Sequence, residues 1–131
     1  MTARPVEVAG VWIVPEVHDP ATGRIDAKKL ARALGVKQSE LAQALQIDPR
    51  SLSRKPTLPK IQERARLLER AFALLIHLLG SEEVARAWLQ APNPNLGGRT
   101  AWEVCRDPEA YPKGLETVVR MLERVVEGIP S

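Results

Sequence analysis

The second half of one long predicted helix carries apolar side chains on almost every side. The helix is expected to run from about Pro59 to Leu79, and eight of the nine residues from 71 to 79 are apolar. A helix that is apolar all round must be buried on several sides. We therefore expect this helix to be the central strut of the fold. His77, which interrupts the apolar run, is expected to be a hydrogen-bonded residue of the core.

Capping and stop residues divide the rest of the chain into shorter helices. Asp, Ser and Thr are favoured N-caps, whereas Gly and Pro end helices. Such signals predict six further helices, at about 27–34, 38–45, 49–55, 82–90, 101–105 and 115–127. Before them, the valine-rich residues 1–19, interrupted by two prolines, predict a short extended arm or a weak hairpin. The expected fold class is all-α: a helix-turn-helix followed by a small helical bundle, with an extended arm at the N-terminus.

The length of 131 residues fits a single globular domain or two very small ones. We expect an N-terminal arm over residues 1–23, a helix-turn-helix region over 24–58, and a further helical domain over 59–131. Only five residues are aromatic, so the core must be built from aliphatic side chains. That composition is typical of packed helices.

The net charge of +3 is distributed unevenly along the chain. Residues 24–70 carry a net charge of +7, whereas residues 1–23 and residues 71–131 each carry −2. Lys and Arg gathered on one segment raise the local electrostatic potential and attract polyanions such as nucleic acid. The alternative interpretation is a solvated helical surface. The middle third of the chain is therefore the candidate for binding a polyanion.

Residues 38–55 have the pattern of a helix-turn-helix, in which a first helix packs on a second helix that enters a groove of DNA. Leu41 and Leu45 supply the inward face of the first helix, and Leu52 anchors the second. The turn contains one departure, because Gln46 occupies a position at which many such motifs carry Gly. A side chain at that position is expected to strain or reshape the turn.

The outward face of the second helix is polar and cationic. At about 100° per residue, two arginines and two serines lie within one arc opposite Leu52. Arg bonds guanine acceptor atoms with its forked guanidinium, and Ser hydroxyls bond bases or phosphates. The sequence therefore predicts DNA binding, with a packing element that binds no DNA as the alternative. The predicted DNA-binding residues are Lys37, Gln38, Arg50, Ser51, Ser53, Arg54 and Lys55.

Residues 92–98, with the sequence PNPNLGG, are expected to form a rigid corner, because prolines and glycines do not continue an α-helix. Asn93 is expected to bond backbone groups of the corner. Trp88 and Leu96 are expected to be buried core residues. Thr100 is the expected N-cap of the next helix. The predicted structural motif comprises Trp88, Asn93, Leu96, Gly97, Gly98 and Thr100.

These features resemble the C-terminal toxin-binding domain of the Xre/MbcA/ParS antitoxin family. The resemblance rests on the run at 87–89 (AWL), on the segment at 92–100 (PNPNLGGRT), and on a closing helix that ends at Glu127 and Gly128. A basic helix-turn-helix ahead of these segments is also the family's arrangement. Two positions depart from the family pattern: Ala101 stands where members often have Pro, and Pro130 stands where an aromatic residue is expected.

Members of this family are helical dimers that neutralise RES-domain toxins, which are enzymes that consume NAD, and many members bind their own promoter. The resemblance therefore implies an antitoxin that occludes the active site of a RES-domain toxin, binds double-stranded DNA at its own operator, and forms a homodimer. The apolar half of the strut and the N-terminal arm are candidate dimer surfaces. The implied toxin-binding residues are Arg99, Arg124, Glu127, Gly128, Ile129, Pro130 and Ser131.

The sequence shows no catalytic or metal-binding pattern. His18 and His77 lie far from Cys105 in the sequence, and one cysteine with two histidines is too few for a structural zinc site. Cys105 is expected to be a small buried hydrophobe. We expect a protein that is not an enzyme and has no metal or cofactor. With no apolar run long enough to cross a bilayer, we expect it in the cytoplasm, without a membrane partner. The alternative function is that of a stand-alone dimeric helix-turn-helix transcription regulator.

Overall fold

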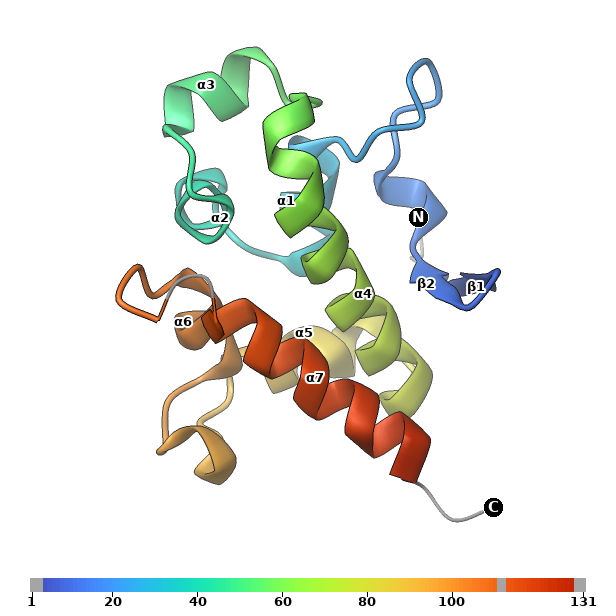
Figure 1. Ribbon diagram of the computed structural model, residues 1–131, viewed down its shortest axis with the longest axis vertical. Helices are drawn as coiled ribbons and strands as arrows, with labels where there is room; N and C mark the ends of the chain where they lie inside the picture. The colour runs from blue at the N-terminus through green and yellow to red at the C-terminus, as the bar shows by residue number, and fades with distance from the viewer. Residues whose placement is uncertain (1–3, 111–112, 129–131) are drawn as a thin grey trace.

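The computed structural model describes residues 4–110 and 113–128. A central helix, α4, runs through the molecule, and the other helices pack around it (Figure 1). The α-helices are α1 (Ala27–Leu34), α2 (Gln38–Leu45), α3 (Pro49–Arg54), α4 (Gln62–Leu79), α5 (Glu82–Gln90), α6 (Ala101–Arg106) and α7 (Lys113–Gly128). The strands are β1 (Val6–Val8) and β2 (Val11–Ile13), and short 3-10 turns lie at Pro15–Val17, Pro59–Ile61 and Pro94–Leu96. The prediction of an all-α fold is confirmed, and the described residues add to it a single two-stranded sheet.

Helix α4 is the strut that its apolar sequence predicts. Every residue from Ala71 to Ile76 is buried. Helices α5 and α7 and strand β2 all pack against α4. His77 departs from the expectation, because its side chain is exposed and its ring centroid lies 4.6 Å from that of Trp12 on β2. The prediction of a core histidine is therefore wrong, since the short hairpin covers this side of α4 only in part.

Side-chain caps determine where several helices begin. The carboxylate of Asp26 accepts two backbone N–H groups of the first turn of α1. The hydroxyls of Ser81 and Thr100 each accept the N–H three residues ahead, at the starts of α5 and α6. At the C-terminal end of α4, Gly80 has φ +88° and ends the helix in the left-handed conformation. These helix limits agree with those predicted from the sequence.

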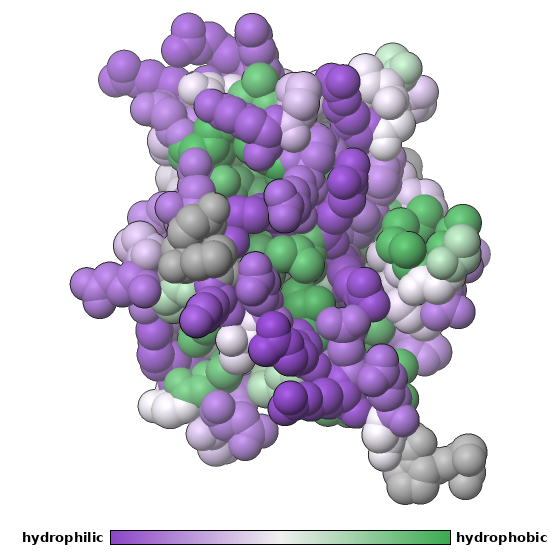
Figure 2. All heavy atoms as spheres, in the orientation of Figure 1, coloured by the Kyte–Doolittle hydropathy of each residue, from purple (hydrophilic) through white to green (hydrophobic). Residues whose placement is uncertain are grey.

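One buried carboxylate attaches the N-terminal hairpin to the strut. Glu69 of α4 is only 2% exposed, and it accepts a hydrogen bond of 2.9 Å from the backbone N–H of Val14. The same oxygen lies 2.5 Å from Nε2 of His18. A buried carboxylate requires such partners, so it ties the chain after β2 to α4. The hairpin beyond it leaves Val8 and Val11 about half exposed. Figure 2 shows a hydrophobic area on the side of the molecule where the hairpin lies.

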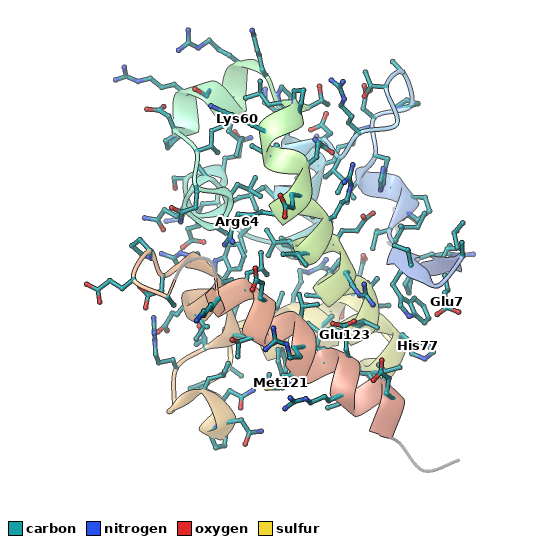
Figure 3. The ribbon with its side chains drawn as sticks, in the orientation of Figure 1. Glu7, Lys60, Arg64, His77, Met121 and Glu123 are labelled. Atoms are coloured by element: carbon teal, nitrogen blue, oxygen red, sulfur yellow. The ribbon has the colours of Figure 1, made fainter. Side chains whose placement is uncertain are left out.

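Guanidinium groups join α1 and α2 to helices that follow them in the chain. Nε of Arg64 on α4 donates to the carbonyl of Ala44 near the end of α2, at 2.7 Å (Figure 3). Arg86 on α5 donates to the carbonyl of Ala33 near the end of α1, at 2.9 Å. Carbonyls in the last turn of a helix need partners from outside that helix. The hydrophobic core also includes residues from both sides of the boundary predicted at residue 58, and that boundary stays a prediction.

A glycine allows α7 to start directly against α6. A Cβ atom on Gly114 would lie only 2.4 Å from the backbone oxygen of Val104, which is closer than real Cβ contacts come. Leu115 and Val118 follow on α7 and are completely buried. The close approach at Gly114 therefore sets the position from which α7 crosses the strut.

Candidate functional site

Helices α2 and α3 are joined by a tight turn at the position that the sequence predicts. Gln46 ends α2 with φ +58° and ψ +49°, the left-handed conformation that favours Gly. Its side-chain amide donates to the carbonyl of Gln43 at 2.9 Å, which offsets part of the strain. Asp48 then caps α3 by accepting the N–H of Arg50 at 2.7 Å. The chain thus enters α3 with a fixed geometry despite the missing glycine.

The predicted DNA-binding residues lie at the surface of the α2–α3 segment. Leu52 is completely buried and anchors α3, which leaves the opposite side of this short helix open to solvent. None of the basic side chains among the predicted residues pairs with a carboxylate in the described part of the chain. Their charge is therefore available to an external anion. Ser51 is half-buried, and the exposed residues are Lys37, Gln38, Arg50, Ser53, Arg54 and Lys55.

Lys60 extends this cationic surface beyond the predicted set. It is exposed on the 3-10 turn before α4, at the same end of the molecule as α3 (Figures 1 and 3). The connection from α3 to this turn is held to α1, because the N–H of Ala27 donates to the carbonyl of Pro56 at 2.9 Å. The excess of basic residues over 24–70 was the sequence signal for Lys60, but only the fold assigns this residue to the α3 end.

Asn93 organises the corner between α5 and α6. Its side-chain oxygen accepts the N–H of Asn95 at 2.9 Å, and its own N–H donates to the carbonyl of Arg99 at 2.9 Å. The Asn93 carbonyl accepts two further N–H groups of the corner. Gly97 and Gly98 follow with φ +68° and +82°, a conformation that other residues rarely adopt. Asn93 therefore has the backbone-bonding role that the sequence predicts.

Trp88 and Leu96 pack against the hydrophobic core, but both are only half-buried rather than enclosed in it. The physical reason is that the corner does not close on α7. It leaves an open hollow of about 600 Å³ between α4, α5 and α7, and Trp88 lines this hollow. We call it the α4–α7 groove, and its lining includes Leu75, Leu78, Trp88, Pro92, Met121 and Val125. Sequence reasoning missed the groove, although the corner motif that forms one wall was recognised.

Arg99 is the predicted toxin-binding residue nearest to the corner. Its side chain is 45% exposed, and its guanidinium donates to the carboxylate of Asp107 at 2.9 Å. The N–H of Glu109 and this guanidinium both donate to Asp107 and hold the pKa of its carboxyl below its usual value. The pair joins the end of the corner to the segment after α6. Arg99 therefore has a structural partner as well as an exposed surface.

Three of the other predicted toxin-binding residues lie at the C-terminal end of α7. This end lies far from α3, at the opposite end of the molecule (Figure 1). Arg124, Glu127 and Gly128 are exposed there. The three remaining predicted residues, Ile129, Pro130 and Ser131, lie outside the described residues. The structure therefore separates the described residues at the end of α7 from the predicted DNA-binding residues (Figure 1), whereas Arg99 lines a hollow together with Gln46 and Asp48 of the α2–α3 turn.

Cys105 does not have the environment of a reactive thiol. It is 2% exposed, and burial raises the pKa of its thiol to about 12, with Arg64 lowering it only in part. The prediction of a small buried hydrophobe is confirmed. Within residues 4–110 and 113–128, no group of three or more His, Cys, Asp or Glu side chains is placed to hold a metal ion. No helix there has the length and apolar character needed to span a membrane.

Comparison with known proteins identifies the second half of the chain. Residues 74–128 match the family described as "Antitoxin Xre/MbcA/ParS C-terminal toxin-binding domain". No curated protein matches the chain significantly. A solved chain in the "Crystal structure of the M.tuberculosis MbcT-MbcA toxin-antitoxin complex" has a similar fold: the TM-score is 0.54 at 21% identity, and the match covers 81% of this chain and 95% of that chain. The predicted resemblance of this part of the chain to the toxin-binding domain of the Xre/MbcA/ParS antitoxin family is thus confirmed for residues 74–128.

Proposed function

We propose that this chain is the antitoxin of a type II toxin-antitoxin pair. It neutralises a RES-domain toxin that consumes NAD by occluding the toxin's active site, and it acts by binding rather than by catalysis. The observation that carries the proposal is the match of residues 74–128 to a toxin-binding domain. The solved chain of similar fold comes from a toxin-antitoxin complex, which supports the same role.

The toxin-binding end in this proposal is the C-terminal end of α7 with the residues that follow it. Arg124 and Glu127 are exposed there, so both are available to a partner. The tail from Gly128 to Ser131 carries Ile and Pro, and an apolar tail beside charged side chains suits an enzyme pocket. In the proposed complex this tail enters the active-site cleft of the toxin and excludes NAD.

The second part of the proposal is repression of the chain's own operon in the cytoplasm. The support is the exposed cationic face of α3, on which Arg50 and Arg54 make no salt bridge with any described residue and can contact bases and phosphates. One helix of six residues reads too few base pairs for a selective operator. The chain therefore binds DNA as a homodimer, with its two α3 helices in half-sites spaced by about one helical turn.

Coexpression with the adjacent reading frame tests the toxin part. We expect the adjacent frame alone to arrest growth and deplete cellular NAD, and coexpression of this chain to restore both. Deletion of residues 128–131 is expected to abolish the rescue while operator binding persists. The antitoxin function would be contradicted if the two proteins do not copurify and the product of the adjacent frame does not consume NAD. Operator binding without any toxin binding would identify a stand-alone regulator.

Salt dependence tests the DNA part. Binding to the chain's own promoter is expected to weaken steeply with salt, because each phosphate contact releases condensed cations. The measurement is fluorescence anisotropy of a labelled promoter fragment over a range of salt concentrations. An association that does not depend on salt would contradict this mode of binding.

A further inference from the structure

The α4–α7 groove is an open apolar surface inside the matched domain. All its lining residues fall between Leu75 and Val125, so it belongs entirely to residues 74–128. None of the described residues that line it is charged. Leu79 and Val125 remain 38% and 47% exposed at its edge. A contiguous apolar surface that stays exposed to solvent often marks an interaction site.

A cationic rim borders the groove on one side. A second hollow of about 390 Å³ shares Met121 and Val125 with the groove and is lined in addition by Arg120 and Arg124. These two arginines are exposed one helical turn apart, and neither pairs with a carboxylate among the described residues. Glu123, by contrast, leaves α7 on another side than Met121 (Figure 3) and pairs with Arg70 on α4. The rim beside the groove therefore carries two arginines that make no salt bridge within the described part of the chain.

The charge of the rim decides between the two kinds of occupant. A two-fold contact between copies of this chain places the same surface on both sides. The cationic rims of both copies would then lie within one contact, and none of the described residues that line either hollow is acidic and could offset their repulsion. A different protein whose apolar segment is flanked by carboxylates satisfies both the groove and the rim.

We propose that the α4–α7 groove receives an apolar segment of the toxin, and that acidic residues flanking this segment pair with Arg120 and Arg124. This inference rests on the proposed antitoxin function and adds a second contact surface to the C-terminal tail. The groove supplies the buried centre of the contact and the arginines supply its rim, which is the usual division within a protein interface. The corner at 92–98 thus has a function besides ending α5, because it forms one wall of the site.

A matched pair of valines tests the groove. Val125 in the groove and Val84 on α5 are almost equally exposed, at 47% and 48%, and Val84 does not line the groove. We expect Val125→Glu to weaken binding of the purified product of the adjacent toxin reading frame by about 100-fold, which is the scale of a central interface residue. Val84→Glu is expected to change the dissociation constant by less than about threefold. Titration calorimetry measures both, and circular dichroism melting curves verify that both variants are folded.

Charge reversal tests the rim. The double variant Arg120→Glu with Arg124→Glu is expected to weaken toxin binding, most strongly at low salt, because attraction across the contact becomes repulsion. The control is Arg32→Glu with Arg66→Glu, which changes the net charge equally at two exposed positions outside the groove. An equal effect of the two double variants would overturn the assignment of the rim, since only net charge would then matter.

Three results would overturn the proposal, and they are distinguishable. If Val125→Glu binds the toxin as the wild type does, the groove is not the site, while the antitoxin function stands. If the wild-type chain binds no toxin at all, the proposed function itself fails and the groove assignment fails with it. If Val125→Glu converts a dimer of the chain alone into a monomer in sedimentation velocity, the groove is a contact between copies.

Discussion

The two ends of the molecule present opposite kinds of surface. At the α3 end, Leu52 is fully buried and the exposed face consists of polar and cationic side chains, among them Arg50 and Arg54. At the α7 end, the groove is apolar and the cations stand only on its rim. A polyanion is bound by charge, whereas a protein partner is bound by a buried apolar centre with a polar border. The difference shows that one small fold can present two surfaces that suit different kinds of partner.

The two ends are also connected through one framework. The indole N–H of Trp102 on α6 donates to the carboxylate of Glu40 on α2, at 3.3 Å. Arg106 on α6 bonds the same carboxylate and also the side chain of Gln43. Helix α6 lies between the α3 end and the groove end, and it is joined to both. The following variants test whether the ends can nevertheless be altered one at a time.

The variant with the largest expected effect removes two cations from α3 and tests whether DNA binding can be lost without loss of toxin binding. Arg50→Ala with Arg54→Ala is expected to lower affinity for the chain's promoter by about 100-fold or more, because each base contact by Arg contributes about 1–3 kcal/mol. Toxin binding should stay unchanged. Fluorescence anisotropy and calorimetry measure the two affinities. The control Arg32→Ala with Arg66→Ala removes the same charge elsewhere, and an equal loss of DNA binding in this control would contradict a local site.

The second variant changes the α7 end indirectly, by disturbing the packing of α7 against α6. Gly114→Ala places a Cβ atom against the carbonyl oxygen of Val104, and forcing this contact is expected to destabilise the protein by about 2 kcal/mol. Since α7 forms a wall of the groove, toxin binding should weaken as well, while DNA binding persists at temperatures where the variant is folded. Urea unfolding gives the stability. Gly128→Ala is the control for the urea measurement alone, because a Cβ atom there meets nothing within 4 Å, whereas Gly128 belongs to the proposed toxin-binding end.

A third variant weakens the corner that borders the groove. Asn93→Ala removes the acceptor for the N–H of Asn95 and is expected to lower the free energy of unfolding by about 1 kcal/mol. Asn95→Ala is the matched control, because that residue contributes only its backbone N–H to this bond. Urea unfolding of both variants measures the difference. Equal stability of the two would show that the Asn93 side chain does not support the corner.

A fourth variant acts at the turn of the α3 end and has the opposite sign. Gln46→Gly removes the strain of the left-handed conformation and is expected to stabilise the protein by about 0.5 kcal/mol, after the loss of one side-chain hydrogen bond. Gln43→Gly, within α2, should instead destabilise by at least about 1 kcal/mol, because it puts a glycine inside the helix and also removes the acceptor of the Arg106 guanidinium. Thermal unfolding of both variants measures the two effects. A destabilised Gln46→Gly variant would show that the amide bond outweighs the strain.

The smallest expected effect is a pH dependence beside the corner. The folded-state pKa of Asp107 lies below its usual value of 3.8, so its ionised form stabilises the fold above that value, and this contribution is lost as the pH falls through the folded pKa. Asp107→Asn should therefore melt below the wild type at neutral pH, with a difference that shrinks on acidification. Glu109→Gln is the control, because only the backbone N–H of Glu109 contacts Asp107. A difference that does not depend on pH would contradict the assignment.

Much of the fold could be predicted because its signals are local. The Asp26, Ser81 and Thr100 caps act within one helical turn, and Gly80 ends α4 through its own backbone conformation. The outward direction of Arg50 and Arg54 follows from the helical period once Leu52 is buried. Each of these features depends on a few neighbouring residues, so the sequence contains enough information to place it.

The differences between prediction and structure concern residues whose environment depends on distant elements. His77 lies in an apolar run, but the hairpin that faces it covers it only in part. Trp88 is a large apolar residue of the kind usually found in a core, yet it is half-buried because the corner and α7 leave a groove between them. The neighbours of these two residues in the sequence carry no information about how closely a distant segment packs against them.

The sequence by itself therefore determined the helices, their caps, the cationic face of α3 and the resemblance of the corner motif, because local hydrogen bonds and the helical period decide them. Only the tertiary structure decided which apolar residues stay open and which cations stay unpaired. The groove between α4 and α7, and the arginines on its rim, depend on the distances between helices that the chain brings together from separate segments. Packing at long range sets those distances, and no local pattern encodes them.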